Sequence, residues 1–120
     1  MKINYLNLTV TDVIATRRFL EKYFGLRPMQ DGAKENPGFD ILRDENDMVL
    51  TLIKGRRGVE VQYPETFHIG FIQESEERVN EINRRLKEDG YDIPPPSRQH
   101  GSWTFYFTCP GGGFTIEVLG

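Results

Sequence analysis

Two stretches of the chain alternate between apolar and polar residues, which is the pattern of a half-buried β-strand. They cover residues 3–10 and 66–73. Alternation puts the larger apolar side chains of each stretch on one face: Leu6, Leu8 and Val10 in the first, and Phe67, Ile69 and Phe71 in the second. Each stretch therefore predicts a strand with one face turned toward a core.

A helical spacing of apolar residues follows the first strand and covers residues 13–24. Thr11 or Asp12 can cap the start of this helix, and Gly25 is a plausible stop. After the second strand, Ser75 can cap a helix that begins at Glu77 or Arg78 and ends at Gly90 and Tyr91. Its buried side is predicted to hold the residues at helical spacing: Val79, Ile82, Leu86 and the stem of Arg85.

Further strands are expected after each helix. In the first half they cover 26–30, 38–43 and 47–54, and in the second half 102–108 and 113–119, the last two joined by a tight turn that begins at Cys109. Proline lacks the amide donor, so the run Ile93-Pro94-Pro95-Pro96 is predicted to be an edge strand or an extended connector.

The two halves thus repeat one order of elements, βαβββ. Equivalent residues are spaced regularly: Tyr5 and His68 lie 63 positions apart, and Gly55 and Gly120 lie 65 apart. Self-similarity at a fixed period indicates two copies of one supersecondary unit. We therefore predict an α+β fold in a single domain, residues 1–120, with a first module at about 1–57, a join at 58–64 and a second module at about 65–120. A cavity is expected where the copies face each other.

Composition limits the classes of function. The chain has 120 residues, and each half alone would be marginally stable, so we expect a shared core or a homodimer. It has no apolar run long enough for a membrane helix and no signal-peptide core at its N-terminus. The single cysteine, Cys109, fits a reducing cytoplasm. The net charge of −3, without a basic patch, argues against nucleic acid as a partner.

Several motifs together resemble the glyoxalase, bleomycin-resistance and extradiol-dioxygenase superfamily, also called the vicinal oxygen chelate superfamily. They are an NxLNLTVTD opening, a helix ending YFGL, a second opening FHIGF, a GY after the second helix and a closing FYFTCPGGGFTIEVLG. The resemblance implies paired βαβββ modules that curl into an incomplete barrel around a cavity, often in a dimer. It also implies a choice among metal-dependent lyases and isomerases, dioxygenases, fosfomycin-modifying transferases and metal-free antibiotic binders. Cys109 departs from the usual Asp-Pro-Asp-Gly turn, and nothing near it in sequence argues for a lowered thiol pKa.

The strongest candidates for chemistry are His68 and Glu117, which alternation places opposite the large apolar residues of their strands. The resemblance implies that these two positions are ligands in metal-using relatives. An imidazole and a carboxylate suit a divalent ion (Zn, Mn, Fe or Ni) that chelates two substrate oxygens.

The first half does not supply matching ligands. The repeat pairs Tyr5 with His68 and Leu52 with Glu117. A neutral phenol is a poor ligand and leucine has no donor, whereas catalytic zinc sites usually have three protein ligands. A third ligand could come from His100 in the loop before Ser102.

An unmetallated site is the alternative. Glu117 could pair with an arginine such as Arg98, or with His68 as a dyad that acts as general acid and base. For the metal-bound interpretation, Asn7, on the Tyr5 face, could supply a weak oxygen ligand in addition to His100.

Aromatic residues form a second signal. Alternation sends Trp103, Phe105 and Phe107 to one face of a strand and Thr104 and Tyr106 to the other, and the sequence does not choose which face lines the cavity. With Tyr5 they could contact a flat or apolar ligand, or they could be core or dimer contacts.

The leading hypothesis is a protein that binds a small organic molecule, without a firmly held metal, in the manner of resistance proteins that sequester an antibiotic. Its ligand contacts would be Tyr5, Asn7, Leu52, Trp103 and Tyr106, with His68 and Glu117 as polar anchors. The alternatives are a divalent-metal enzyme of the lyase, isomerase or dioxygenase type, in which His68 and Glu117 are catalytic, and a scaffold dimer without a ligand.

Overall fold

The chain is described by a computed structural model over residues 1–30, 32 and 34–120. It divides into two compact units. The first unit contains Met1–Tyr63 together with the turn Cys109–Gly113, and the second contains Pro64–Thr108 and Phe114–Gly120. We call these units the first and second modules. The turn 109–113 thus comes from the second half of the sequence but packs in the first module.

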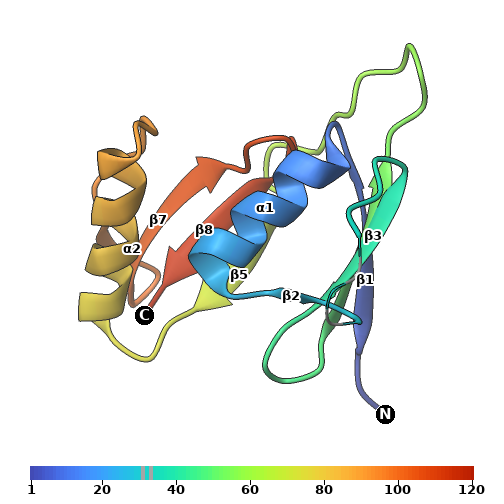
Figure 1. Cartoon of the computed structure of the whole chain (residues 1–120). Helices are drawn as coiled ribbons and strands as arrows, with labels where there is room; N and C mark the ends of the chain where they lie inside the picture. Colours follow the sequence, from blue (N-terminus) through green and yellow to red (C-terminus); the bar gives the residue numbers. More distant parts are fainter. Residues whose placement is uncertain (31, 33) are drawn as a thin grey trace. The chain divides into compact units, whose positions relative to one another are not determined.

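The first module has the predicted order of elements (Figure 1). Its elements are β1 (Tyr5–Val10), α1 (Val13–Phe24), β2 (Arg27–Pro28), β3 (Phe39–Arg43) and β4 (Val49–Lys54). The four strands form one sheet in the order β1-β4-β3-β2, in which β1 and β4 are parallel and the other pairs are antiparallel.

The second module repeats this arrangement (Figure 1). Its elements are β5 (His68–Ile72), α2 (Glu76–Glu88), β6 (Ser97–Gln99), β7 (Ser102–Thr108) and β8 (Thr115–Leu119). The sheet order is β5-β8-β7-β6, again with one parallel pair, β5 and β8. The predicted α+β fold with two βαβββ modules is therefore confirmed, while the barrel and its cavity stay predictions.

The helix ends follow the capping residues. Asp12 Oδ1 accepts a hydrogen bond from the Ala15 amide at 2.9 Å, and Gly25 ends α1 in the left-handed region with φ +69°. Ser75 Oγ accepts from the Arg78 amide at 3.1 Å, and α2 starts at Glu76, one or two residues before the predicted start at Glu77 or Arg78. Neither helix is long and apolar enough among the described residues to cross a membrane.

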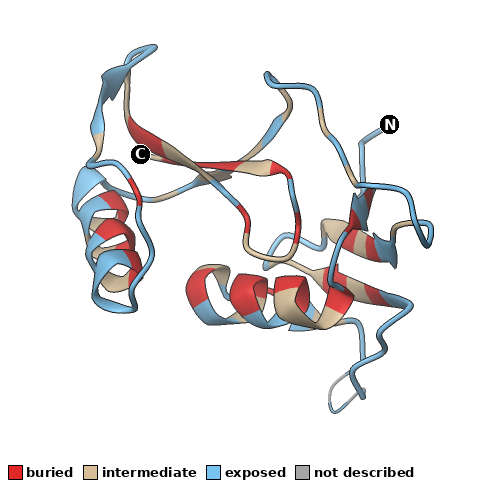
Figure 2. Cartoon of the chain, turned by 90° about the horizontal axis from the view of Figure 1, so that it is seen from above, coloured by how far each residue is buried: buried red, intermediate tan, exposed pale blue. Residues whose placement is uncertain are grey.

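Each helix packs on its own sheet, α1 on β3 and β4 and α2 on β7 and β8. Figure 2 shows buried residues, in red, on both helices. Complete burial of a large apolar side chain contributes roughly 1.5–3 kcal/mol, so these contacts supply most of the favourable free energy of folding. In the first module the buried set includes Leu8, Val10, Val13, Leu20, Leu42 and Leu52; in the second it includes Val79, Ile82, Leu86, Phe105, Ile116 and Val118.

Buried polar side chains fasten each helix differently. In the first module, Arg17 Nη1 of α1 forms an ion pair with Asp40 Oδ2 of β3 at 2.7 Å, with both side chains nearly buried. In the second module, Asn83 Nδ2 of α2 donates to the carbonyl oxygen of Pro94 at 2.8 Å. The proline run is therefore a connector held against α2, and the short strand β6 that follows it was not predicted.

Candidate functional site

His68 and Glu117 meet on one face of the second module's sheet. In the parallel pair β5–β8, Glu117 lies opposite Gly70, and His68 is two residues earlier on the same face. Because Gly70 has no side chain, the imidazole and the carboxylate approach each other directly, with 3.4 Å between His68 Nε2 and Glu117 Oε1. The two residues that the sequence singled out are thus brought together.

The other ring nitrogen fixes the His68 tautomer. His68 Nδ1 lies 2.9 Å from the carbonyl oxygen of Thr66. A carbonyl oxygen only accepts hydrogen bonds, so Nδ1 carries the hydrogen, an assignment made from the hydrogen-bonding partners. In the uncharged ring the lone pair is therefore on Nε2 and faces Glu117.

The Glu117 carboxylate is nearly buried, with 9% of the residue exposed. Thr104 Oγ1 donates a hydrogen bond to Glu117 Oε2 at 2.8 Å. No lysine or arginine within the described part of the chain pairs with this carboxylate, since Arg98 instead binds Glu76 at 2.8 Å. Of the two pairings that the sequence left open for Glu117, the structure contains the one with His68.

Tyr106 completes this polar group. Burial, followed by the hydrogen bond to Glu117 and its negative charge, raises the pKa of the Tyr106 hydroxyl, which keeps it as a proton donor. The ring packs edge-on against His68 with 5.5 Å between ring centres. We call His68, Thr104, Tyr106 and Glu117 the His68–Glu117 centre.

Trp103 lies away from this centre. Its Nε1 donates to Asn80 Oδ1 of α2 at 2.7 Å, and the Arg98 guanidinium lies over its ring at 5.5 Å. The structure therefore resolves the alternation of β7: Thr104 and Tyr106 face Glu117, and Trp103 and Phe105 face the helix side.

The first module corrects one equivalence drawn from the repeat. Tyr5 and Asn7 are exposed on β1, and Asn7 lies opposite Thr51 of β4, as Gly70 lies opposite Glu117. The residue that matches Glu117 is therefore Thr51, and the expected match of Leu52 with Glu117 is wrong. Leu52 is fully buried on the opposite face of the sheet, because a shift of one residue along a strand reverses the side of the side chain.

Within the described part of the chain, no third metal ligand is found near the pair. His100 lies in the turn between β6 and β7 with φ +53°, before Ser102, and β7 separates Ser102 from Tyr106 by roughly 13 Å at about 3.3 Å per residue. Over residues 1–30, 32 and 34–120, no three His, Cys, Asp or Glu side chains are grouped as a metal site. His68 and Glu117 thus fit two positions of a divalent ion, fewer than the three protein ligands of catalytic zinc.

Cys109 is buried, and this burial raises the pKa of its thiol to about 12. A thiol with this pKa stays protonated and is a poor nucleophile. The result agrees with the interpretation that Cys109 has a place in the turn and not in the chemistry.

Comparison with known proteins gives one family. A family model described as Glyoxalase/Bleomycin resistance protein/Dioxygenase superfamily matches residues 2–118. No curated protein matches the chain. Among solved structures, a possible glyoxalase from Bacillus cereus is 54% identical, with 100% of this chain and 99% of that chain covered and a TM-score of 0.87.

Two more distant structures share the fold. Lactoylglutathione lyase from Agrobacterium tumefaciens is 19% identical, with 98% and 92% of the two chains covered and a TM-score of 0.73. A mutant of the fosfomycin resistance protein FosX from Listeria monocytogenes, complexed with Mn(II) and a dihydroxypropylphosphonic acid, is 20% identical, with 98% and 90% covered and a TM-score of 0.75.

Proposed function

Because the chain belongs to the Glyoxalase/Bleomycin resistance protein/Dioxygenase superfamily, we propose that it binds a small organic molecule at the His68–Glu117 centre. The observation that carries this proposal is the approach of His68 Nε2 to Glu117 Oε1 at 3.4 Å while Nδ1 is occupied by the Thr66 carbonyl.

This approach needs a proton or a hydrogen-bond donor between the two atoms. With the hydrogen on Nδ1, an uncharged His68 presents a lone pair to a carboxylate oxygen that also only accepts. Two acceptors at this distance repel each other unless a proton or a donor group of a ligand lies between them. A ligand hydroxyl or amine that donates to Nε2 and Oε1 relieves this repulsion, and it also satisfies a carboxylate that is nearly buried.

The surroundings suggest the rest of the ligand. The Tyr106 ring stands edge-on beside the imidazole and offers an apolar wall. His68 itself is 42% exposed at its side chain, so a ligand can reach Nε2 from solvent. A ligand with a donor group on a flat or apolar body fits these features. A charged His68 could also give its Nε2 proton to such a ligand, and in the reverse step Nε2 would take that proton back, while Glu117 could accept a proton from another group of the ligand.

A metal-dependent enzyme is the second candidate, favoured by the same lone pair on Nε2. His68 and Glu117 would be the protein ligands, and a bound divalent ion would supply Lewis-acid chemistry to a substrate with vicinal oxygens. Tyr5 and Thr51 occupy the matching positions of the first module, and neither is a strong ligand. Metal-free binding therefore remains the first choice.

The test uses thermal unfolding of chelator-treated protein with catechol as the probe. A ligand that binds only the folded state raises Tm by mass action, so catechol should raise it and veratrole, whose oxygens are methylated, should not. The rise should disappear in His68→Ala and Glu117→Gln and persist in Trp103→Phe, whose ring lies on the other face of β7. An equal rise with veratrole, or a rise that survives both variants, would contradict the proposal.

Metal analysis of the purified protein separates the two candidates. Stoichiometric metal that is lost in both His68→Ala and Glu117→Gln would establish the metal-dependent alternative. Absence of bound metal, together with a catechol response, would support metal-free binding. The predicted homodimer is checked on the same samples by light scattering.

A further inference from the structure

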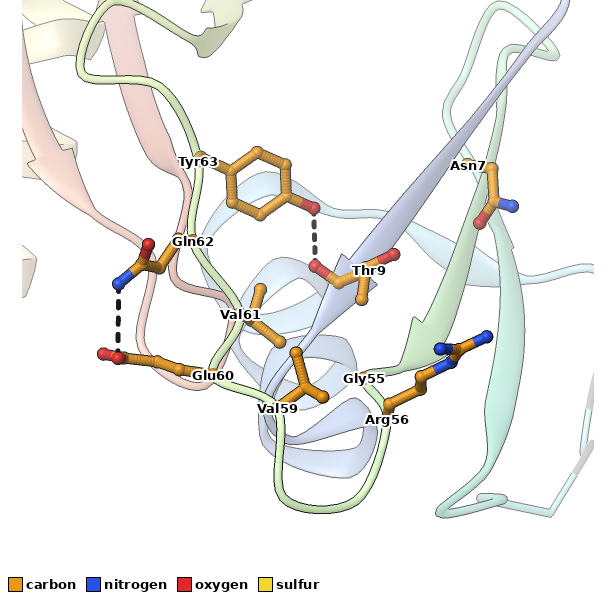
Figure 3. A pocket seen from close by; sticks show the side chains of 9 residues that line it. All are labelled: Asn7, Thr9, Gly55, Arg56, Val59, Glu60, Val61, Gln62 and Tyr63. Atoms are coloured by element: carbon orange, nitrogen blue, oxygen red, sulfur yellow. Dashed lines mark hydrogen bonds between the residues drawn. The ribbon is translucent and has the colours of Figure 1, made fainter.

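A separate pocket of about 410 Å³ lies within the first module (Figure 3). A pocket of this size falls in the range that takes small organic ligands. Its walls are formed by two side chains of β1 and by the segment 55–63. We call this segment the linker. The lining residues are Asn7, Thr9, Gly55, Arg56, Val59, Glu60, Val61, Gln62 and Tyr63.

The linker packs against itself and against two neighbouring segments. The Tyr63 hydroxyl donates a hydrogen bond to the carbonyl oxygen of Thr9, as the dashed line in Figure 3 shows. Gly55 lies so near Val61 that a Cβ there would stand 2.6 Å from Val61 Cγ2, and Val61 also packs near Gly113 of the turn. The pocket is therefore formed before any ligand arrives, which lowers the entropic cost of binding.

Two donor groups in the lining have no hydrogen-bonding or ion-pair partner among the described residues. Neither the Arg56 guanidinium nor the Asn7 amide has a hydrogen bond or ion pair with any residue that the structure describes. The carboxylate in the lining, Glu60, accepts a hydrogen bond from Gln62 Nε2 at 3.2 Å and lies across the pocket from Arg56 (Figure 3). A guanidinium free of protein carboxylates matches the two oxygens of a ligand carboxylate.

The remaining surface is apolar. The side chains of Val59 and Val61 project from the linker toward β1 (Figure 3). Thr9 lies opposite Ile53 of β4, which in turn lies opposite Phe39 of β3, so all three share one face of the sheet. Ile53 is 38% exposed and Phe39 50% exposed. An apolar strip thus continues from the pocket across the sheet.

We propose that this pocket is a second binding site, for a small organic carboxylate with an aromatic or aliphatic body. Arg56 and Asn7 hold the carboxylate, and Val59, Val61 and Ile53 contact the body. The site is contained in the first module and shares no residue with the His68–Glu117 centre. It therefore stands or falls independently of the function proposed above.

The experiment follows backbone amide shifts by NMR as benzoate and 3-phenylpropionate are added, with benzamide and benzyl alcohol as uncharged counterparts. The carboxylates should cause saturable shifts at Thr9, Arg56 and the amides of 59–63, and benzamide and benzyl alcohol should not. Arg56→Gln should weaken binding at least tenfold. Arg57→Gln is the matched control, because Arg57 is the exposed neighbour outside the lining, and it should change the affinity less than twofold.

Several results would overturn this site. They are shifts that do not saturate with either carboxylate, equal binding of benzamide, unchanged affinity in Arg56→Gln, and an equal loss in Arg57→Gln, which would indicate only diffuse attraction to positive charge. If the probe no longer binds His68→Ala but still binds Arg56→Gln normally, it occupies the His68–Glu117 centre. That result would also overturn the proposal. Asn7→Ala should weaken the binding of both carboxylates and leave the hydrogen bond from the Tyr63 hydroxyl to the Thr9 carbonyl intact.

Discussion

The two modules share a framework and differ in what they place on it. Both have a strand, a capped helix and an open sheet with the same pairing order. The second module carries His68 and Glu117 where the first carries Tyr5 and Thr51. Apolar alternation has to persist in both modules because each needs a core, whereas the residues on the open face can differ. The comparison teaches that the architecture is duplicated and the chemistry is not.

Buried charge also has a different setting in each module. In the first, Asp40 faces Arg17, a partner that is charged at all ordinary pH values and is itself nearly buried. In the second, Glu117 faces His68, whose side chain is 42% exposed and can meet a ligand. A buried partner suits a structural role, and an exposed partner suits a site.

The largest expected effect tests the corrected match between the modules. Leu52→Ala should lower the free energy of unfolding by about 2–5 kcal/mol, since it opens a cavity under α1. Thr51→Ala, one residue away on the open face, should change it by less than about 1 kcal/mol. Urea unfolding measures both. Similar losses in the two variants would show that the register of β4 has been misassigned.

A smaller effect is expected at the Glu117 carboxylate. Thr104→Val keeps the side-chain shape and removes the donor to Glu117 Oε2, so it should cost about 1.5–3 kcal/mol, the usual loss for a hydrogen bond to a charged group. Measured by urea unfolding in a Glu117→Gln background, the same change should cost clearly less. If the cost is equal in both backgrounds, the hydrogen bond does not stabilise the carboxylate.

The N-cap residues of the two helices should contribute similarly to stability, because they occupy equivalent places in the two modules. Asp12→Ala and Ser75→Ala each remove an acceptor for an amide of the first helical turn, and each should cost about 1 kcal/mol. Thermal unfolding of the two variants gives the comparison. A loss confined to one of them would mean that the other helix starts without help from its cap.

The smallest effect concerns the turn Cys109–Gly113, which packs in the first module, and the loss of stability at alkaline pH. The pKa of Cys109 is raised to about 12 from an ordinary value of 9.0, so the folded state retains a proton that the unfolded chain loses. Stability from this source is present below pH 9 and is lost as the pH rises toward 12; between pH 8 and 9.5 we expect a loss below about 1 kcal/mol. Urea unfolding at the two pH values should show it, and Cys109→Ala should not. A thiol that reacts rapidly with maleimide at pH 8 in folded protein would contradict the raised pKa.

Much of the fold could be predicted because local signals agreed with one another. Helix α1 begins after Asp12 and ends before Gly25, as its cap, apolar spacing and stop residue indicated. The three-residue strand β6 could not be predicted, since its residues are polar and exposed and follow a proline run. Its pairing with β7 depends on tertiary position and not on local pattern.

The candidate site was predictable only where alternation and family resemblance pointed to the same residues. His68 and Glu117 met both conditions. Thr51 was missed because the spacing of glycines fixes the length of a repeat but not the face of a strand. The linker pocket was missed because Arg56 and Val61 lie in a segment without periodicity, and their common wall depends on the contacts of Tyr63 and Gly55.

The ion pair between Arg17 and Asp40 has a consequence for how this chain can diverge. Loss of Asp40 alone would take the buried counter-charge away from a nearly buried guanidinium, and breaking a buried pair costs about 3–5 kcal/mol. That is a large part of the stability of a small domain, whereas an apolar pair at both positions can be tolerated. Among descendants of this sequence, the two positions should therefore covary, and lineages with only one of them replaced should be rare.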